Sequence, residues 1–194
     1  MPPTDHQPFP EAAASPRVAD VGERRLLARI RQWLGPVTPA APAGMGDDCA
    51  VLDAPREGRQ LLTTDTVTYG QHFDDSVSAK DAGAKLVKRN LSDIAAMGGS
   101  PGPALLSLLC GPDLSLDWLE AFFSGLRQTC ETYAVDIVGG DVSEAGPGRF
   151  SAVLWLTGAS ANPVLRQTAG PGDAIYVTGE LGGSLLGKHC AFTP

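Results

Sequence analysis

The chain has 194 residues, of which 43% are apolar, and this length suffices for one complete domain and the beginning of another. A formal net charge of −7 argues against a nucleic-acid backbone as the main partner. It does not exclude phosphorylated ligands, because acidic sites bind phosphates through metal ions.

The cysteines, the N-terminal segment and the apolar runs all indicate a reduced protein away from membranes. Cys49, Cys110, Cys130 and Cys190 form no C-x-x-C pair, so we interpret them as reduced core thiols. The N-terminal segment lacks the apolar region of a secretory signal, and no apolar run approaches membrane-spanning length. We therefore expect a cytoplasmic protein that binds neither membrane nor nucleic acid.

The first third of the chain is expected to contain a tail, a helix and a loop. Residues 1–20 are rich in Pro and Ala and predict a disordered tail. Apolar residues at helical spacing predict an amphipathic helix over 22–34, whose buried face is formed by Leu26, Leu27, Ile30 and Leu34. A loop rich in Pro and Gly follows at 35–45.

Strands and helices then alternate along the chain. They are, in order, a turn and short strand at 46–53, a strand at 60–67, a helix at 78–97, a strand at 103–110, a helix at 117–133, a strand at 135–138, a Gly-Gly-Asp loop at 139–141, strands at 150–158 and 173–179, and the start of a helix at 181–189. This alternation predicts an α/β or α+β layered fold. The last strand and helix have nothing after them to pack against, so we expect one domain over 21–165 and the start of a truncated second domain over 166–194.

Asp93 poses a specific question within the predicted 78–97 helix. It borders the apolar stripe of that helix, which is formed by Leu86, Val87, Leu91, Ile94 and Ala95. A carboxylate at the edge of a core needs a partner. The candidates are a cation from the same helix (Lys85, Lys88 or Arg89), solvent, or a bound metal ion.

Further carboxylates follow strand ends and tight turns. Asp48 lies in a Gly-Asp-Asp turn, Asp65 follows Thr63 and Thr64 in a strand, and Asp141 follows two glycines. Each alone has a plain structural alternative as a turn, cap or loop residue. If Asp48, Asp65, Asp93 and Asp141 converge, they repel one another unless a cation lies between them. We therefore predict a cleft that holds several Mg²⁺ ions and a phosphate ligand.

Five motifs in chain order resemble one enzyme family. They are MGDDCAVLD, LLTTDTVTYGQHF, NLSDIAAMGGSP, DIVGGDVS and LRQTAGPGDAIYVTG. Together they resemble the thiamine-monophosphate kinases, within the superfamily of aminoimidazole ribonucleotide synthetase-like ATP-binding proteins. The resemblance implies the N-terminal domain of that fold, with a mixed β-sheet flanked by helices and paired with a second sheet across a homodimer. It also implies ATP-dependent phosphorylation of thiamine monophosphate to thiamine diphosphate by direct in-line transfer.

The resemblance also assigns roles to individual residues. The positions that match Mg²⁺ ligands are Asp48, Thr63, Thr64, Asp65, Asp93 and Asp141. The positions that match contacts to ATP are Gly140, Asp141 and Arg166. His72 matches a position that contacts the thiamine phosphate substrate, and no residue is implied as a nucleophile or base.

Members of this family are longer than 194 residues, and their second domain supplies a further acidic motif. We therefore expect this chain alone not to turn over. Two alternatives stay open: another ATP-binding member of the superfamily, or an inactive module for dimerisation or nucleotide binding. The segment GGSLLGKH at 182–189 lacks the final hydroxyl of a Walker A motif, and we interpret it as the first helix of the second domain.

Overall fold

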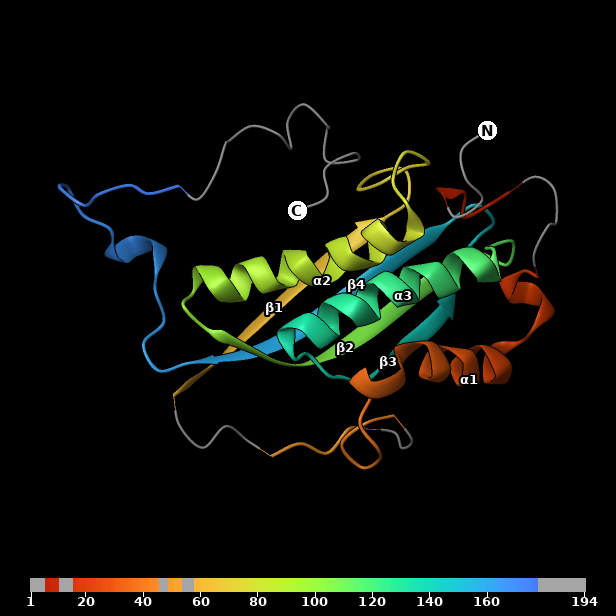
Figure 1. The fold of residues 1–194 in the computed structure, drawn as a ribbon, viewed down its shortest axis with the longest axis horizontal. Helices are drawn as coiled ribbons and strands as arrows, with labels where there is room; N and C mark the ends of the chain where they lie inside the picture. The colour runs from red at the N-terminus through yellow and green to blue at the C-terminus, as the bar shows by residue number, and fades with distance from the viewer. Residues whose placement is uncertain (1–5, 11–15, 46–48, 54–57, 178–194) are drawn as a thin grey trace.

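The computed structural model describes residues 6–10, 16–45, 49–53 and 58–177, which form one sheet with helices packed against it (Figure 1). The elements are, in chain order, the 3₁₀ helix η2 (Val18–Asp20), α1 (Glu23–Leu34), η3 (Gly35–Val37), β1 (Arg59–Thr68), α2 (Ala79–Ala96), β2 (Ser100–Cys110), α3 (Leu116–Tyr133), β3 (Ile137–Glu144), β4 (Phe150–Ser160) and η4 (Arg166–Thr168). The expected α/β fold is confirmed.

The sheet is mixed, and its strand order is β1-β4-β2-β3. Strand β4 pairs antiparallel with both β1 and β2, whereas β2 and β3 are parallel. A parallel pair needs a crossover connection, which α3 supplies. Strands β1 and β3 therefore form the two edges of the described sheet, with two strands between them.

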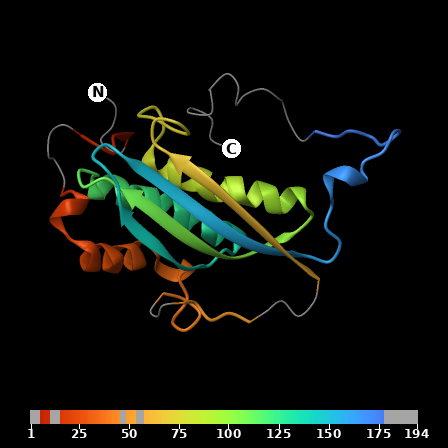
Figure 2. The same cartoon turned by 180° about the vertical axis from the view of Figure 1, so that it is seen from behind.

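Helices α2 and α3 cover one face of the sheet (Figure 1). The core between these layers contains an aromatic cluster whose ring centroids lie 4.9–5.8 Å apart along the series Phe73, Trp118, Phe122 and Phe150. Helix α1 packs beside α3, where the Trp33 and Phe123 rings are 5.5 Å apart. The other face of the sheet, seen in Figure 2, is covered by neither α2 nor α3, and we call it the helix-free face.

The helix boundaries follow the predicted ones to within one or two residues. Ser78 and Ser115 cap α2 and α3, where their hydroxyls accept hydrogen bonds from the backbone N–H groups of Asp81 and Trp118. Two details differ from the expected faces. Leu27 of α1 is 43% exposed although it was placed on the buried face, and Ala95 of α2 is exposed although it was placed in the apolar stripe.

Three expected features of the backbone are wrong within the described residues. Residues 49–53 form no strand. The Gly-Gly-Asp segment is not a loop, because β3 continues through it to Glu144 in parallel register with β2. Glycine at position 140 permits this pairing, because a Cβ atom there would clash with the Leu106 carbonyl oxygen.

The third wrong feature is the strand expected over 173–179, because residues 173–177 form no strand. The side chains of Ile175 and Tyr176 are 94% and 89% exposed, so no described residue covers them. Residues 178–179 and the helix expected at 181–189 lie outside the described residues.

Two stretches of the expected disordered tail pack against the domain. The Phe9 and Tyr69 rings are 5.5 Å apart. The backbone carbonyls of Pro8 and Pro16 accept hydrogen bonds from the N–H groups of Ser115 and Leu116 at the start of α3. The N-terminal segment therefore supports the first turn of α3 at these two points.

Candidate cation and nucleotide site

The structure gathers polar side chains where β1 faces α2. Thr63 and Asp65 lie two residues apart on β1 and point to the same face of the sheet. Arg89 and Asp93 lie four residues apart on α2 and share one side of that helix. We call these four residues the β1/α2 corner.

Two short polar contacts join the elements of this corner. The Thr63 hydroxyl Oγ1 donates a hydrogen bond of 2.6 Å to Oδ2 of Asp93. One guanidinium nitrogen of Arg89 lies 2.6 Å from Oδ1 of Asp65, which also accepts a hydrogen bond of 3.1 Å from the backbone N–H of Thr66. The partner of Asp93 in the structure is therefore a hydroxyl of β1 and not one of the cations on its own helix.

The donor set of the corner suits a hard divalent cation. It offers one hydroxyl and two carboxylates, which are the oxygen ligands that Mg²⁺ prefers. Asp93 is exposed, and the side chains of Asp65 and Arg89 are 24% and 31% exposed. A hydrated ion and phosphate oxygens can therefore reach these groups from solvent.

Asp141 does not join this corner within one chain. It lies on β3, and its register partner on β2 is Ser107, whereas Asp65 lies on β1 at the opposite edge. Three strand spacings separate the two edges, a distance of about 14 Å. Across the four strands, the register places Asp141 level with Thr66. Because successive residues of a strand point to opposite faces, Asp65 and Asp141 point to opposite faces of the sheet.

The expectation that Asp65, Asp93 and Asp141 would converge in one cleft is therefore wrong for a single chain. Within the ranges that the structure describes, no three acidic, histidine or cysteine side chains gather as a metal-binding group. The sequence pattern identified element ends, but it could not tell that β1 and β3 occupy opposite edges of the sheet. Asp48 lies outside the described residues.

Thr64 also points away from the corner. It alternates with Thr63 and Asp65 along β1 and pairs with Trp155 on β4, on the helix-free face. Only Thr63 of the two threonines therefore offers its hydroxyl to Asp93.

His72 lies in a well-connected turn after β1, at the end of α2 that begins with Ala79. Its ring nitrogen Nδ1 accepts a hydrogen bond of 3.1 Å from the backbone N–H of Thr68. This contact places the proton of the neutral ring on Nε2. The Nζ atom of Lys85, a residue only 3% exposed, donates a 2.6 Å hydrogen bond to the backbone carbonyl of His72.

A tyrosine and a carboxylate brace the same turn. The Tyr69 hydroxyl donates a hydrogen bond of 2.8 Å to Oδ1 of Asp75. Burial, followed by this bond and the nearby charge of Asp75, raises the pKa of Tyr69 to about 12. Hydrogen bonds from Thr68, Lys85 and Tyr69 therefore hold the turn that carries His72.

The residues expected to contact ATP lie in two separate places, Arg166 near the end of α2 and Gly140 and Asp141 on the edge strand β3. Arg166 is exposed in η4, and the preceding chain is held near the end of α2 by a hydrogen bond from Val164 N–H to the Met97 carbonyl. That end of α2 also carries Asp93. Gly140 and Asp141 lie on the far edge strand β3.

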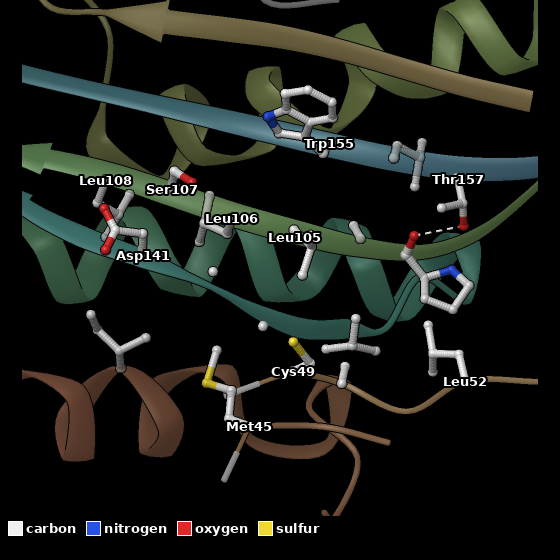
Figure 3. A pocket seen from close by; sticks show the side chains of 18 of the residues that line it. Met45, Cys49, Leu52, Leu105, Leu106, Ser107, Leu108, Asp141, Trp155 and Thr157 are labelled. Carbon is white, nitrogen blue, oxygen red and sulfur yellow. Dashed lines mark hydrogen bonds between the residues drawn. The ribbon is translucent and has the colours of Figure 1, made fainter. Parts of the chain in front are cut away.

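A pocket of about 740 Å³ lies against the helix-free face of the sheet (Figure 3). Leu105 and Trp155 line it from the sheet, and Met45, Cys49 and Leu52 line it from the segment after α1. Asp141 also lines it, and its carboxylate Oδ2 accepts a 2.6 Å hydrogen bond from the Ser143 hydroxyl. This pocket was not predicted, although the apolar residues on both faces of β2 and β4 were a signal for it.

Among the described residues, no helix combines the length and apolarity needed to span a membrane.

Residues 46–159 match the family model of the AIR synthase related proteins, N-terminal domain. The chain is 38% identical over 172 residues to the thiamine-monophosphate kinase of Rhodopirellula baltica, an alignment that covers 84% of this chain and 52% of that protein. The chain thus spans about half the length of the curated relatives it matches.

Solved structures agree with this similarity. The thiamine monophosphate kinase of Aquifex aeolicus superposes with a TM-score of 0.53 and 30% identity, covering 72% of this chain and 44% of that one. A structure of AaThiL complexed with AMPPCP and TMP superposes with a TM-score of 0.53 and 31% identity, covering 78% and 46%. The hydrogenase maturation protein HypE in complex with ATP has a TM-score of 0.60 at 20% identity over 74% and 43% of the two chains, a likeness of fold alone.

Proposed function

Since the chain belongs to the AIR synthase related proteins and carries their N-terminal domain, we propose that it forms the Mg²⁺- and ATP-binding part of a thiamine-monophosphate kinase. The reaction is the transfer of the γ-phosphoryl group of ATP to thiamine monophosphate, which yields thiamine diphosphate and ADP. Its relatives of 33–38% identity bear that name, and a structural neighbour of 31% identity is a complex with AMPPCP and TMP.

The β1/α2 corner is the observation that supports this proposal most directly. Thr63 and Asp93 are already in contact at 2.6 Å, and Asp65 lies two residues from Thr63 on the same face of β1. The contact between Thr63 and Asp93 already brings two hard oxygens together, which lowers the cost of organising ligands around a cation. A bound Mg²⁺ would neutralise charge that develops on the transferring phosphoryl group.

The remaining residues take positioning roles in this proposal. Arg166 lies two residues after Val164, which is bonded to the end of α2 near Asp93, and in this proposal its guanidinium binds phosphate oxygens. His72 lies in the braced turn at the other end of α2, and in this proposal its imidazole contacts a phosphate of the substrate. The acceptor phosphate of thiamine monophosphate attacks directly, so no protein nucleophile takes part.

We further propose that two copies of the chain pair through the helix-free face of the sheet. Exposed apolar side chains gather there, including Leu62 at 71%, Trp155 at 56% and Leu105 at 44% exposure. Patches of this kind are typical of protein interfaces. Because Asp141 lies on the far edge strand and points to the opposite face, it does not act beside the β1/α2 corner of its own chain.

The test is a kinase assay with thiamine monophosphate and Mg-ATP. We would compare the 194-residue chain, the Rhodopirellula baltica enzyme, and this chain joined to the second half of that enzyme. Thiamine diphosphate should form with the joined protein and with the relative, and far less with the 194-residue chain. A joined protein that is folded and binds Mg-ATP but phosphorylates no thiamine monophosphate would refute the proposed substrate.

The same assay tests His72. In the joined protein, His72→Ala should raise KM for thiamine monophosphate much more than KM for ATP, because the imidazole contacts only the acceptor. Equal effects on the two KM values would remove His72 from the substrate site.

A further inference from the structure

Arg89 occupies an unexpected position in the β1/α2 corner. Its guanidinium lies 2.6 Å from Oδ1 of Asp65, one of the two carboxylates that we assign to the cation. An arginine side chain holds its positive charge at every pH of interest. The corner therefore contains a cationic group of the protein beside an oxygen that a divalent cation would need as a ligand.

The neighbouring side chains do not remove Arg89 from this position. Lys85, one turn earlier on α2, points its Nζ to the His72 carbonyl. Asp93, one turn later, accepts the hydrogen bond of Thr63. Arg89 is thus the guanidinium next to Asp65, and the corner carries two carboxylates against one guanidinium.

A purely structural role explains this ion pair poorly. Both side chains are partly exposed, at 31% and 24%. Ion pairs of this exposure contribute little to stability, because water screens them and ordering two side chains costs entropy. The same weakness makes the pair easy to displace, since a divalent cation brings twice the charge to the same carboxylate.

We propose that Arg89 is an internal counter-ion that competes with the divalent cation for Asp65. Without the cation the guanidinium neutralises Asp65 and keeps it against α2. When the cation binds, Arg89 must leave Oδ1, and its side chain is then free to reach a phosphate oxygen of the nucleotide. This inference rests on the proposed function, because it assumes that the corner binds a divalent cation.

The competition has a measurable consequence. Removing the charge of Arg89 should tighten cation binding, since the cation no longer displaces a guanidinium or lies beside one. The expected gain is about two- to tenfold in Kd, in keeping with the small strength of partly exposed ion pairs. Because salt screens such pairs, the gain should shrink as ionic strength rises.

The experiment measures Mn²⁺ binding to the full 194-residue chain by electron paramagnetic resonance of the free ion. The variants are Arg89→Gln, Arg89→Lys and Asp65→Asn. Arg127→Gln is the matched control, because Arg127 also pairs with a carboxylate, that of Glu131, but on α3. Arg89→Gln should bind Mn²⁺ more tightly than both the wild type and Arg127→Gln, and Arg89→Lys should lie nearer the wild type.

The outcomes separate this inference from the function on which it rests. If Asp65→Asn weakens Mn²⁺ binding while Arg89→Gln binds as the wild type or more weakly, the counter-ion role is wrong and the cation site stands. If Asp65→Asn leaves Mn²⁺ binding unchanged, both the cation site and the role of Arg89 fall. A loss of thermal stability in Arg89→Gln without tighter Mn²⁺ binding would make the pair merely structural, and would also overturn the inference.

Discussion

The described cysteine side chains differ in burial and therefore in the reactivity of their thiols. Cys110 and Cys130 are at most 2% exposed, and burial raises the pKa of each thiol to about 12. Cys49 is exposed and lines the pocket on the helix-free face. The interpretation as core thiols is confirmed for Cys110 and Cys130 and is wrong for Cys49, and Cys190 lies outside the described residues.

Thiol labelling checks this difference. In a Cys190→Ser variant of the folded protein at pH 8, a disulfide reagent should react rapidly with one thiol, Cys49. The two buried thiols should react only after unfolding, because a pKa near 12 leaves about one thiolate in ten thousand at that pH. Rapid labelling of two or more thiols would contradict the burial, and adding Cys49→Ser should abolish the rapid phase.

Asp93 shows how far single residues can be predicted. Its place beside an apolar stripe indicated a carboxylate at the edge of the core that needs a partner, but Asp93 is exposed. The cations on α2 were natural candidates, because helical spacing puts them within reach. The actual partner, Thr63, lies 30 positions earlier on another element. Only the packing of α2 against β1 determines that contact, so local spacing could not reveal it.

The two central helices approach each other closely at paired glycines. A Cβ atom on Gly83 of α2 would overlap the Phe122 carbonyl oxygen, and one on Gly125 of α3 would overlap the Lys80 carbonyl oxygen. No side chain fits at either position without moving one helix. The glycines thus fix the depth at which α2, which carries Asp93, lies in the molecule.

Alanine substitutions test this close approach. Gly83→Ala and Gly125→Ala should each lower the free energy of unfolding by roughly 1–3 kcal/mol through overpacking. Gly146→Ala is the control, because nothing lies within 4 Å of its added Cβ, and its effect should stay within about 0.5 kcal/mol. Urea unfolding followed by circular dichroism gives the values. Equal stabilities of all three variants would mean that the helices are not this close.

The presence of helices and strands was predicted better than the ends of the strands and their order in the sheet. Periodicity correctly gave the three α-helices and the strands that became β1, β2 and β4. It failed at β3, where two glycines indicated a loop, because close backbone approach and turn formation both favour glycine. Strand order depends on contacts between distant residues, so the opposite placement of β1 and β3, and with it the position of Asp141, was not accessible.

The helix-free face of the sheet determines how the whole molecule is expected to assemble. If two copies pair through it, the wild type should sediment as a dimer at micromolar concentration, and Trp155→Lys should shift it to a monomer by burying a charge. Tyr133→Lys is the control, because Tyr133 is similarly exposed at 47% but lies on α3. A wild type that is monomeric at all concentrations, or a dimer untouched by Trp155→Lys, would contradict this assembly.

Titration calorimetry with AMPPCP tests whether the β1/α2 corner binds a nucleotide through a divalent cation. The wild-type chain should bind AMPPCP in the presence of Mg²⁺ and much more weakly in EDTA. Asp93→Asn should weaken the Mg²⁺-dependent binding by roughly tenfold or more, since one charged ligand contact is lost. Glu120→Gln, an equal charge change on the exposed side of α3, should leave it unchanged. Binding that is indifferent to Mg²⁺, or that Asp93→Asn leaves intact, would contradict the account.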